Sequence, residues 1–367
     1  MKPLTAIAVS GGIDSLVAAY LLKNECHEVI GIHFLTGYEA LNLDPTKKPV
    51  SVSPHAPGVS TAKEETRRSA DHISNQLGIR VELLDCSTEF NKTVVDYFTQ
   101  TYQAGRTPNP CLVCNPRIKF GTVLSFAEKL GASRLATGHY ARLNRDGQGR
   151  FHLLRGIDKK KDQSYFLAMM TQSKLAGACF PLGDMTKSEV VDLARDKGLH
   201  PVKRAESQDI CFIKGNRYGE FLSTRSGFEP EPGIIEDVNG DILGEHQGLH
   251  LFTIGQRRGI NCPAAEPYYV VRIDKTKNRL VVGYKKDLLS SECRIVNINW
   301  IIQKPDSPIK VQTRVRYRHI AAPSTLIPVD AGTAVVRFKT PQSALTPGQG
   351  AVFYRDDEVL GGGWIDN

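Results

Sequence analysis

Strand-like and helix-like segments alternate through the first half of the chain, and this alternation limits the possible folds more than any other feature. The expected strands are residues 4–9, 28–34, 81–85 and 134–141, and the expected helices are residues 15–23, 61–77, 89–103, 117–130 and 186–197. Strands that alternate with helices build a parallel sheet covered on both faces. We therefore expect an α/β fold with a doubly wound, Rossmann-like parallel sheet. Residues 36–59 contain four prolines and no periodicity, and we expect a loop there.

The pattern changes after residue 211. Turns rich in Gly and Pro then separate short alternating strands, and residues 268–273 and 279–284 predict a hairpin. From residue 292 onwards nearly every segment is strand or turn, which predicts an all-β barrel. The length of 367 residues exceeds what one compact domain usually holds. We place a parallel-sheet domain at residues 1–212, a small mixed central domain at 213–288 and the barrel at 289–367.

Composition excludes several classes of protein. Hydrophobic residues make up 41% and charged residues 23% of the chain, which is too apolar for a disordered protein. No apolar run approaches the roughly 18 residues of a membrane helix. The first residues, MKPLTAIAVSGG, lack the features of a signal or transit peptide, so we expect a cytoplasmic protein without a membrane partner. The net charge of +8 is by itself weak evidence for nucleic-acid binding.

The string S-G-G-I-D-S at residues 10–15 lies between an expected strand and an expected helix. Two glycines allow a tight turn whose N–H groups, with the Ser hydroxyls and the helix N-terminus, can bind an anion. A bare Gly-Gly pair is also typical of an ordinary βα turn, but the complete string resembles the PP-loop of ATP pyrophosphatases. No Gly-Lys-Ser/Thr follows, so it is not a Walker A loop. The resemblance implies cleavage of ATP between its α- and β-phosphates, with Asp14 acting through Mg²⁺.

Eight cysteines are present, and in a long cytosolic chain they are not expected to form a disulfide framework. Residues 105–115, GRTPNPCLVCN, form a proline-stiffened loop between two expected helices. Cys114 would lie just before the helix at 117–130, where the helix dipole lowers the pKa of a thiol. A structural Cys-x-x-Cys or a zinc site is the alternative, but no second ligand pair follows at the usual spacing. Cys211, preceded by a polar stretch, is the third thiol expected to take part in chemistry.

Seven strings spread from end to end resemble the bacterial tRNA-specific 2-thiouridylase family, whose members replace O2 of the wobble uridine by sulfur. The strings are SGGIDS (10–15), GRTPNP-x-LVCN-x-RIKFG (105–121), ATGHYAR (136–142), LLRGIDKKKDQSYFL (153–167), ESQDICFI (206–213), GLHLFTIGQRRG (248–259) and LTPGQGAVFY (345–354). The resemblance implies ATP and Mg²⁺ as cofactors and release of AMP and pyrophosphate. It implies as partners a tRNA with a wobble uridine in its anticodon loop and a protein that donates or relays sulfur, but neither DNA nor a membrane.

The resemblance also carries residue roles to matching positions of this chain. Cys114 matches the catalytic cysteine, and Cys211 matches the cysteine that carries the persulfide. The ATP site matches Ala8, Val9, Ser10, Gly11, Gly12, Ile13, Asp14, Ser15, Phe34 and Gly138. Positions near the target base or the tRNA match Asn109, Pro110, Cys111, His139, Lys161, Asp162, Gln163, Arg316, Tyr317 and Gln349. His139 is alternatively a satisfied core histidine.

The basic stretch KVQTRVRYR adds Arg318 to the expected tRNA contacts. Its alternation predicts a strand that places four polar side chains on one face, namely Gln312, Arg314, Arg316 and Arg318. A solvated face is the alternative. The neighbouring Tyr317, Lys339 and Gln349 favour phosphate binding.

Cys111 departs from the family pattern, because many members have Asp at this position. Together with Cys114 and Cys211 it offers the three thiolates that a 4Fe–4S cluster with one open iron position requires. Two routes of sulfur delivery therefore remain. The one we prefer is a persulfide on Cys211 that leaves a Cys114–Cys211 disulfide, and the other is a hydrosulfide bound to a cluster.

Two functions of other classes compete with thiolation. A small-molecule PP-loop synthetase, of the argininosuccinate synthase or amide synthetase type, predicts neither the cysteine pair nor the basic β module. A non-catalytic RNA-binding module would not need an intact SGGIDS string.

Overall fold

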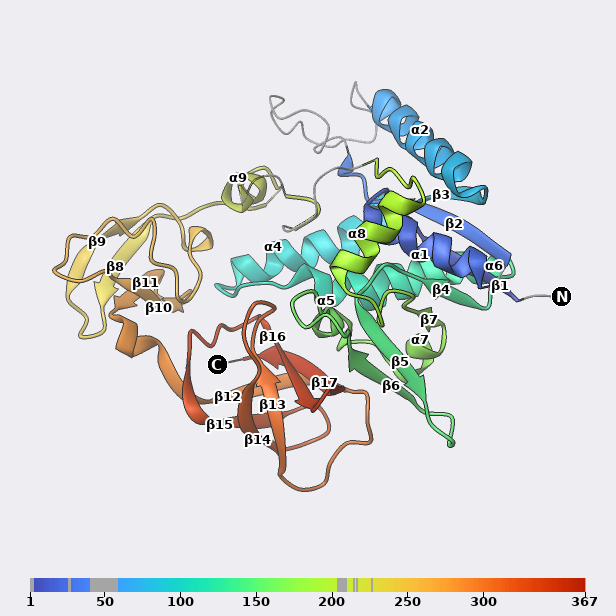
Figure 1. Cartoon of the computed structure of the whole chain (residues 1–367). Coiled ribbons are helices and arrows are strands. Elements are labelled where there is room, and N and C mark those ends of the chain that lie inside the picture. Colours follow the sequence, from blue (N-terminus) through green and yellow to red (C-terminus); the bar gives the residue numbers. More distant parts are fainter. Residues whose placement is uncertain are drawn as a thin grey trace. The chain divides into compact units, whose positions relative to one another are not determined.

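The computed structural model describes residues 3–25, 28–39, 59–202, 210–213, 215, 217–225 and 227–366 (Figure 1). The chain divides into two compact units. The first unit comprises residues 1–94, 111–216 and 357–359, and the second comprises residues 95–110, 217–356 and 360–367. The expected loop at 36–59 lies mostly outside the described residues, and the domain boundaries at 212 and 288 stay a prediction.

A five-stranded parallel sheet forms the centre of the first unit, in the order β3-β2-β1-β4-β7. The strands are β1 (Leu4–Ala8), β2 (Glu28–Leu35), β3 (Arg80–Asp85), β4 (Arg134–Ala136) and β7 (Ala178–Cys179). The prediction of a doubly wound parallel sheet is therefore confirmed. Since β1 is central, the segment that follows it lies at the carboxyl edge of the sheet, where ligands bind in this class of fold.

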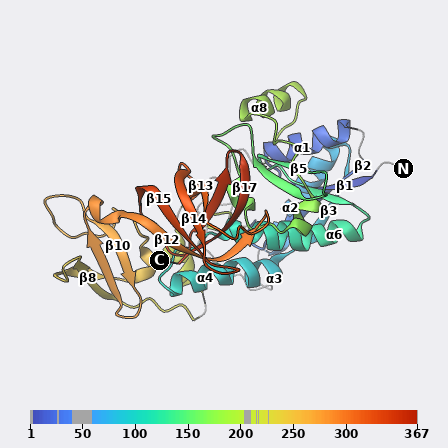
Figure 2. The ribbon, with the colours of Figure 1, turned by 90° about the horizontal axis from the view of Figure 1, so that it is seen from below.

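Helices cover the sheet on both faces. On one face, α1 (Ile13–Asn24), α2 (Val59–Leu77) and α8 (Lys187–Asp196) share a core that includes Ile7, Leu16, Ile73 and Val190. Figure 2 shows α1 and α8 on one side of β1 and α6 on the other. The other helical segments up to residue 176 are α3 (Ser87–Phe90), η2 (Asn91–Val95), α4 (Asp96–Gln103), α5 (Pro110–Cys114), η3 (Asn115–Val123), α6 (Leu124–Lys129), η4 (Ser164–Leu167) and α7 (Gln172–Ala176), of which α4 belongs to the second unit.

Two predicted elements of the first unit have the wrong boundaries. The helical residues expected at 117–130 begin at Pro110, because proline is tolerated in the first turn of a helix. The segments α5, η3 and α6 follow one another directly, with a kink at Phe120. Pro116, farther along, has no N–H for the α-helical bond, and the chain widens there into the π-helical segment η3. The strand expected at 134–141 ends at Ala136, and an unpredicted hairpin follows, β5 (Ala141–Arg145) and β6 (Phe151–Arg155).

The central sheet of the second unit has the order β10-β11-β8-β9. Its strands are β8 (Gly233–Asp237), β9 (Ile242–His246), β10 (Tyr269–Asp274) and β11 (Arg279–Gly283). The helix α9 (Tyr218–Ser223) precedes β8, and η5 (Leu249–Leu251) lies between β9 and β10. The hairpin predicted around residues 268–284 is confirmed by the antiparallel pairing of β10 with β11. Apolar side chains of β10 and β11, including Val270 and Leu280, pack into one small core.

Six antiparallel strands of the second unit form a closed barrel, because β12 pairs with β17 as well as with β15. The strands are β12 (Leu289–Trp300), β13 (Ile309–Arg314), β14 (Ala322–Pro328), β15 (Ala334–Ser343), β16 (Gly350–Arg355) and β17 (Glu358–Ile365), with η6 (Lys285–Leu288) before them. The all-β prediction is confirmed. Closure leaves no unpaired edge among these strands.

The strand predicted over KVQTRVRYR is too long. β13 ends at Arg314, so Arg316 and Arg318 lie in the exposed turn that follows and not on a strand face with Gln312. The guanidinium of Arg314 stacks on the ring of Tyr317, 5.1 Å from its centroid, and donates a hydrogen bond to the Tyr317 carbonyl. These local contacts end the strand.

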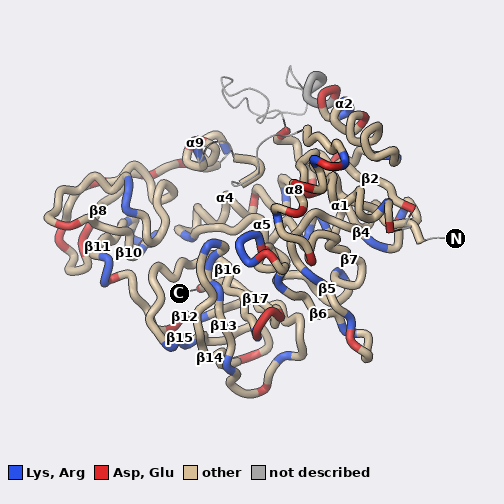
Figure 3. Tube along the Cα trace, viewed as in Figure 1, with Lys and Arg blue, Asp and Glu red and all other residues tan. Residues whose placement is uncertain are grey.

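Figure 3 shows Lys and Arg on many elements of both units, with Asp and Glu among them. Among the described residues, no helix combines the length and the apolar composition needed to cross a membrane.

Candidate nucleotide and thiol site

The turn at residues 10–15 connects β1 to α1 and has the geometry of an anion site. Gly11 adopts φ +78°, which favours glycine, and Gly12 caps the N-terminus of α1. The Ser15 hydroxyl accepts a hydrogen bond from the Ser10 backbone N–H at 3.2 Å and donates one to the Gly12 carbonyl at 2.9 Å. Hydrogen bonds within the turn therefore fix its conformation, and the first N–H groups of α1 can donate to a phosphate.

Asp14 binds two side chains from distant parts of the first unit. Its Oδ1 accepts hydrogen bonds from the Tyr140 hydroxyl and from the Lys187 ammonium group, each at 2.7 Å. The side chain of Lys187 is only 15% exposed, and that of Asp14 is 33% exposed. This ion pair places a cation beside the turn, where a pyrophosphate needs positive charge. Among the described residues both contacts use Oδ1, which leaves Oδ2 to face a Mg²⁺ ion.

Sequence reasoning missed Lys187, which lies in the first turn of the helix expected at 186–197. Thr186 and Glu189 form a capping box around it, with Glu189 accepting from the Thr186 N–H at 2.6 Å. The Lys187 backbone N–H also donates to Asp158 at 3.0 Å. The box fixes where α8 begins, and it could have pointed to Lys187 as a cation held at a defined place.

The other predicted nucleotide residues surround the same turn. Ala8 and Val9 are buried at the end of β1, Ile13 begins α1, and Phe34 is half-buried near the end of β2. Gly138 lies against the turn, since a Cβ at this residue would be 3.0 Å from the Asp14 carbonyl carbon and from the Ser15 nitrogen.

Replacing Gly138 by alanine should therefore displace the start of α1. A methyl group forced against backbone atoms costs about 1–3 kcal/mol of folding free energy. We expect a lower melting temperature and weaker ATP binding in calorimetry. Gly131→Ala changes a glycine with open space around its Cβ, and because its φ of +87° carries its own strain it serves as the control for stability alone. Equal ATP affinity in the Gly138→Ala protein would contradict the proposed contact.

The three predicted reactive thiols lie in the first unit and act on one another electrostatically. Cys111 and Cys114 are both in α5, so Cys114 lies inside a continuous helix and not before its N-terminus. The expected lowering of its pKa is wrong: desolvation by burial raises the pKa of Cys114, and Lys119 opposes this only in part. Desolvation also raises the pKa of Cys211 to about 12, although the residue reaches solvent.

The positive charge of Lys119 lowers the pKa of all three thiols, those of Cys111, Cys114 and Cys211. Its ammonium group lies 3.4 Å from Nε2 of His139, whose Nδ1 lies 2.7 Å from the Thr137 hydroxyl. Burial and Lys119 hold the pKa of His139 well below its usual value. His139 is therefore neutral and accepts from Lys119, which fixes the ammonium group in place.

Replacing Lys119 by methionine should make Cys114 less reactive. Loss of a nearby cation raises a thiol pKa, so the thiolate fraction at any given pH falls and the reactivity profile moves to higher pH. We expect alkylation of Cys114 by iodoacetamide, followed by mass spectrometry, to slow about tenfold near neutral pH for each unit of pKa gained. Lys129→Met removes the same charge from an exposed position of α6 and should change nothing. An unmoved profile in Lys119→Met would refute this assignment.

Comparison with known proteins matches the whole chain to one family. Residues 4–215 match the model of a tRNA methyl transferase HUP domain, residues 219–284 that of a tRNA methyl transferase PRC-barrel domain, and residues 290–365 that of an aminomethyltransferase beta-barrel domain. A tRNA-specific 2-thiouridylase MnmA of Desulfosudis oleivorans is 47% identical over 364 residues, which cover 99% of this chain and 95% of the relative. The chain belongs to the tRNA-specific 2-thiouridylase family.

Two more relatives named tRNA-specific 2-thiouridylase MnmA are similar to this chain over nearly its full length. The 2-thiouridylase of Geobacter metallireducens is 43% identical, with 98% of this chain and 96% of the relative covered. That of Trichormus variabilis is 40% identical, with 98% and 97% covered. The 2-thiouridylase family uses a PP-loop, which implies ATP with Mg²⁺, and the turn at residues 10–15 fits both.

The iron–sulfur cluster on Cys111, Cys114 and Cys211 stays a prediction. Across the ranges described above, no three His, Cys, Asp or Glu side chains are grouped so that they could hold a metal ion. The seven described cysteines are free, and Cys26 lies outside the described residues. We therefore assign no step to a cluster.

The positions that match tRNA contacts of the thiouridylase family differ in what they bind here. Asp162 is buried and accepts hydrogen bonds from the backbone N–H groups of Gly156 and Ser164, at 3.2 and 3.0 Å. Gln163 accepts from the Tyr140 N–H at 3.1 Å, and the Lys161 N–H donates to Asp158. These side chains and amides fix the loop after β6.

The second unit holds the rest of these positions. Asn109 and Pro110 are buried at the start of α5. Gln349 donates hydrogen bonds to the carbonyls of Thr107 and Pro108, in the loop that precedes α5. Arg316 and Arg318 are exposed, with the Arg316 guanidinium donating to the Ser343 carbonyl at 3.3 Å.

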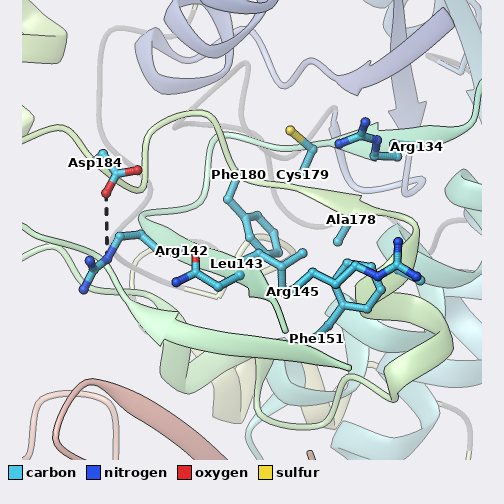
Figure 4. Close-up of a pocket in the computed structure, with 11 residues that line it drawn as sticks. Arg134, Arg142, Leu143, Arg145, Phe151, Ala178, Cys179, Phe180 and Asp184 are labelled. Carbon is cyan, nitrogen blue, oxygen red and sulfur yellow. Dashed lines mark ion pairs between the residues drawn. The ribbon is translucent and has the colours of Figure 1, made fainter. Parts of the chain in front are cut away.

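A cavity of about 510 Å³ in the first unit contains none of the predicted residues. Figure 4 shows Arg134 and Cys179 on one side and Arg145 beside Phe151 on the other, with Arg142 paired to Asp184 at 3.9 Å. The turn and the three thiols predicted from the sequence therefore do not line this cavity.

Proposed function

We propose that this chain catalyses ATP-dependent 2-thiolation of the wobble uridine of tRNA. The observation that carries the proposal is the pair of consecutive residues Gly138 and His139. Gly138 packs against the nucleotide turn, and His139 contacts Lys119, the cation that acts on the thiols. A reaction that consumes ATP and sulfur at one carbon needs both sites next to each other.

The chemistry proceeds in two stages. The uridine O2 attacks the α-phosphorus of ATP, the bond to the β-phosphate oxygen breaks, and pyrophosphate leaves. The turn at residues 10–15 and Lys187 hold the leaving charge, and Mg²⁺ supplies further neutralisation when bound. The adenylated oxygen is then a good leaving group, and holding sulfur near C2 is mainly a matter of positioning. A base within an anticodon loop must leave its stack to reach this site.

Sulfur delivery in the proposed route starts from a persulfide on Cys211, supplied by a sulfur-relay protein. The Cys114 thiolate attacks the inner sulfur, the S–S bond breaks, and hydrosulfide leaves. Hydrosulfide attacks C2, AMP departs, and a Cys114–Cys211 disulfide remains for a cellular thiol to reduce. Since both resting thiols have raised pKa values, the Lys119 charge that favours the thiolate is part of the proposal.

The test uses the full chain with tRNA, ATP, Mg²⁺ and a persulfide donor. We expect 2-thiouridine by mass spectrometry of the digested tRNA, and AMP in equal amount. Release of ADP would overturn the adenylation step. AMP formation from a small carboxylate or amine without tRNA would indicate a small-molecule synthetase instead.

The second unit, with its central sheet and barrel, is proposed to bind the tRNA. Replacing Arg316 and Arg318 together by glutamine should weaken tRNA binding because two exposed cations of one turn are lost. The logarithmic salt slope should fall by about one for each phosphate contact removed. Anisotropy titrations at several salt concentrations measure this slope. Arg195→Gln, on the exposed side of α8, is the control, and an unchanged slope in the double variant would mean that the turn is merely solvated.

A further inference from the structure

Gln349 contacts the loop that precedes the reactive cysteines. This glutamine ends the turn between β15 and β16 and is half-buried. Its Nε2 donates one hydrogen bond to the Thr107 carbonyl at 3.2 Å and a second to the Pro108 carbonyl at 2.9 Å. One amide group thus holds two consecutive carbonyls, and Asn109 and Pro110 follow directly.

Neighbouring residues of the same turn reinforce this contact. The Thr107 N–H donates to the Pro347 carbonyl at 2.9 Å. Gly348 has φ +88°, and a Cβ there would be 2.8 Å from the Thr107 carbonyl oxygen, so only glycine permits this approach. We call residues 346–349 the barrel clamp. All of these residues belong to the second unit.

Further contacts hold the two ends of the loop. The Arg106 guanidinium pairs with the Asp366 carboxylate at 2.7 Å. The Asn109 N–H donates to the Tyr97 hydroxyl at 3.3 Å, and the Tyr97 ring packs 5.6 Å from that of Trp364. The loop is therefore attached along its length by side chains and by the barrel clamp.

The sequence explains why the loop depends on outside donors. Pro108 and Pro110 have no N–H group, so the segment cannot form a regular ladder of its own. The carbonyls of Thr107 and Pro108 belong to no helix or strand, and a buried carbonyl without a partner is costly. Gln349 satisfies both.

We propose that Gln349 is a positioning residue that fixes the residues before α5 and thereby the start of the helix that carries Cys111 and Cys114. This rests on the proposed function, in which those thiols deliver sulfur. It gives Gln349 a task within the chain itself, beyond the tRNA contact that the family resemblance implies.

The first experiment measures the loop without tRNA or turnover. In Gln349→Glu the side chain keeps its size, but a carboxylate faces two carbonyls and donates nothing. We expect hydrogen exchange at the Thr107 and Asn109 amides to accelerate about tenfold, which is what loss of one or two hydrogen bonds implies. Gln342→Glu alters another half-buried glutamine of the barrel, bonded to Thr340 and His319, and should leave this loop unchanged.

Gly348→Ala tests the same clamp by a different route, through steric pressure on Thr107, and should accelerate the same amides. If Gln349→Glu fails to fold, as judged by its melting curve, Gly348→Ala and the milder Gln349→Met decide the question. Unchanged exchange at both amides in the folded variants would overturn the proposal.

The second experiment separates positioning from tRNA binding. We expect kcat for 2-thiouridine formation to fall about tenfold in Gln349→Glu while KM for tRNA stays within about twofold, because the defect lies in the thiol helix. A rise in KM with unchanged kcat and unchanged exchange would show a tRNA contact only and would overturn the inference. Should the chain form no 2-thiouridine at all, the proposed function fails, and the exchange experiment still tests the clamp.

Discussion

Replacing Cys114 by serine should reduce 2-thiouridine formation by about three orders of magnitude or more, as loss of a nucleophile does in other enzymes. An alcohol does not ionise near neutral pH and cannot form the disulfide that releases hydrosulfide. The fold should survive, because serine is close in size and Cys114 is only half-buried. Cys211→Ser should give the same loss, since no persulfide can then form. The measurement is 2-thiouridine per tRNA by mass spectrometry.

Cys179→Ser is the matched control. Cys179 is a half-buried cysteine of the same unit, at the edge strand β7, and its pKa is also raised by burial. Full activity in Cys179→Ser beside inactive Cys114→Ser would show that the loss is chemical. Residual activity of Cys114→Ser above about one tenth of normal would exclude it as the attacking thiol.

Cys111 distinguishes the two routes of sulfur delivery. In the persulfide route it is auxiliary, so Cys111→Asp, which restores the commoner family residue, should remain active. In a cluster route it would be an iron ligand, and activity would require about four irons per chain. Iron and sulfide analysis after anaerobic purification, followed by aerobic assay of iron-free protein with a persulfide donor, decides between the two.

Replacing Lys187 by methionine should reduce AMP formation about a hundredfold, which is the usual effect of removing one group that stabilises developing charge. The substitution removes the cation beside the nucleotide turn and leaves Asp14 bonded, among the described residues, to the Tyr140 hydroxyl. The assay is tRNA-dependent AMP release at saturating ATP. Lys187→Arg keeps the charge and should retain part of the activity.

Two comparisons make the Lys187 result specific. Lys197→Met removes an exposed lysine at the C-terminal end of the same helix and should have no effect. Asp14→Asn breaks the ion pair from the other side, and the double variant should lose little more than the worse single variant, because the two residues act as a unit. Fully additive losses would mean that Lys187 and Asp14 act separately.

Much of the fold could be predicted because it depends on local pattern. A few adjacent residues are enough to predict each of three elements. These are the buried strand before residues 10–15, the start of α8 at Thr186–Glu189 and the alternating strands after residue 292. The string at 10–15 gave the anion turn for the same reason, since two glycines and two serines suffice to build it.

What could not be predicted depends on contacts between distant residues. Lys187 reaches Asp14 across 173 residues, and no local pattern predicts that pair. The environment of Cys114 was mispredicted because the helical residues start early, at Pro110, and continue past Pro116, where a proline usually ends a helix. The residue roles at the thiol and tRNA positions stay predictions until the variants above are measured.

The adjacency of Gly138 and His139 has a consequence for genetics. Covalent neighbours at the end of a short strand cannot move independently, so a change that shifts the nucleotide turn should also shift His139 and, through Lys119, the thiols. In a selection for restored tRNA thiolation, second-site suppressors of a weakened Lys119 should therefore appear around residues 10–15 and 137–140, far from the cysteines in sequence. Nucleotide use and sulfur chemistry would then vary together in the family and not as separable traits.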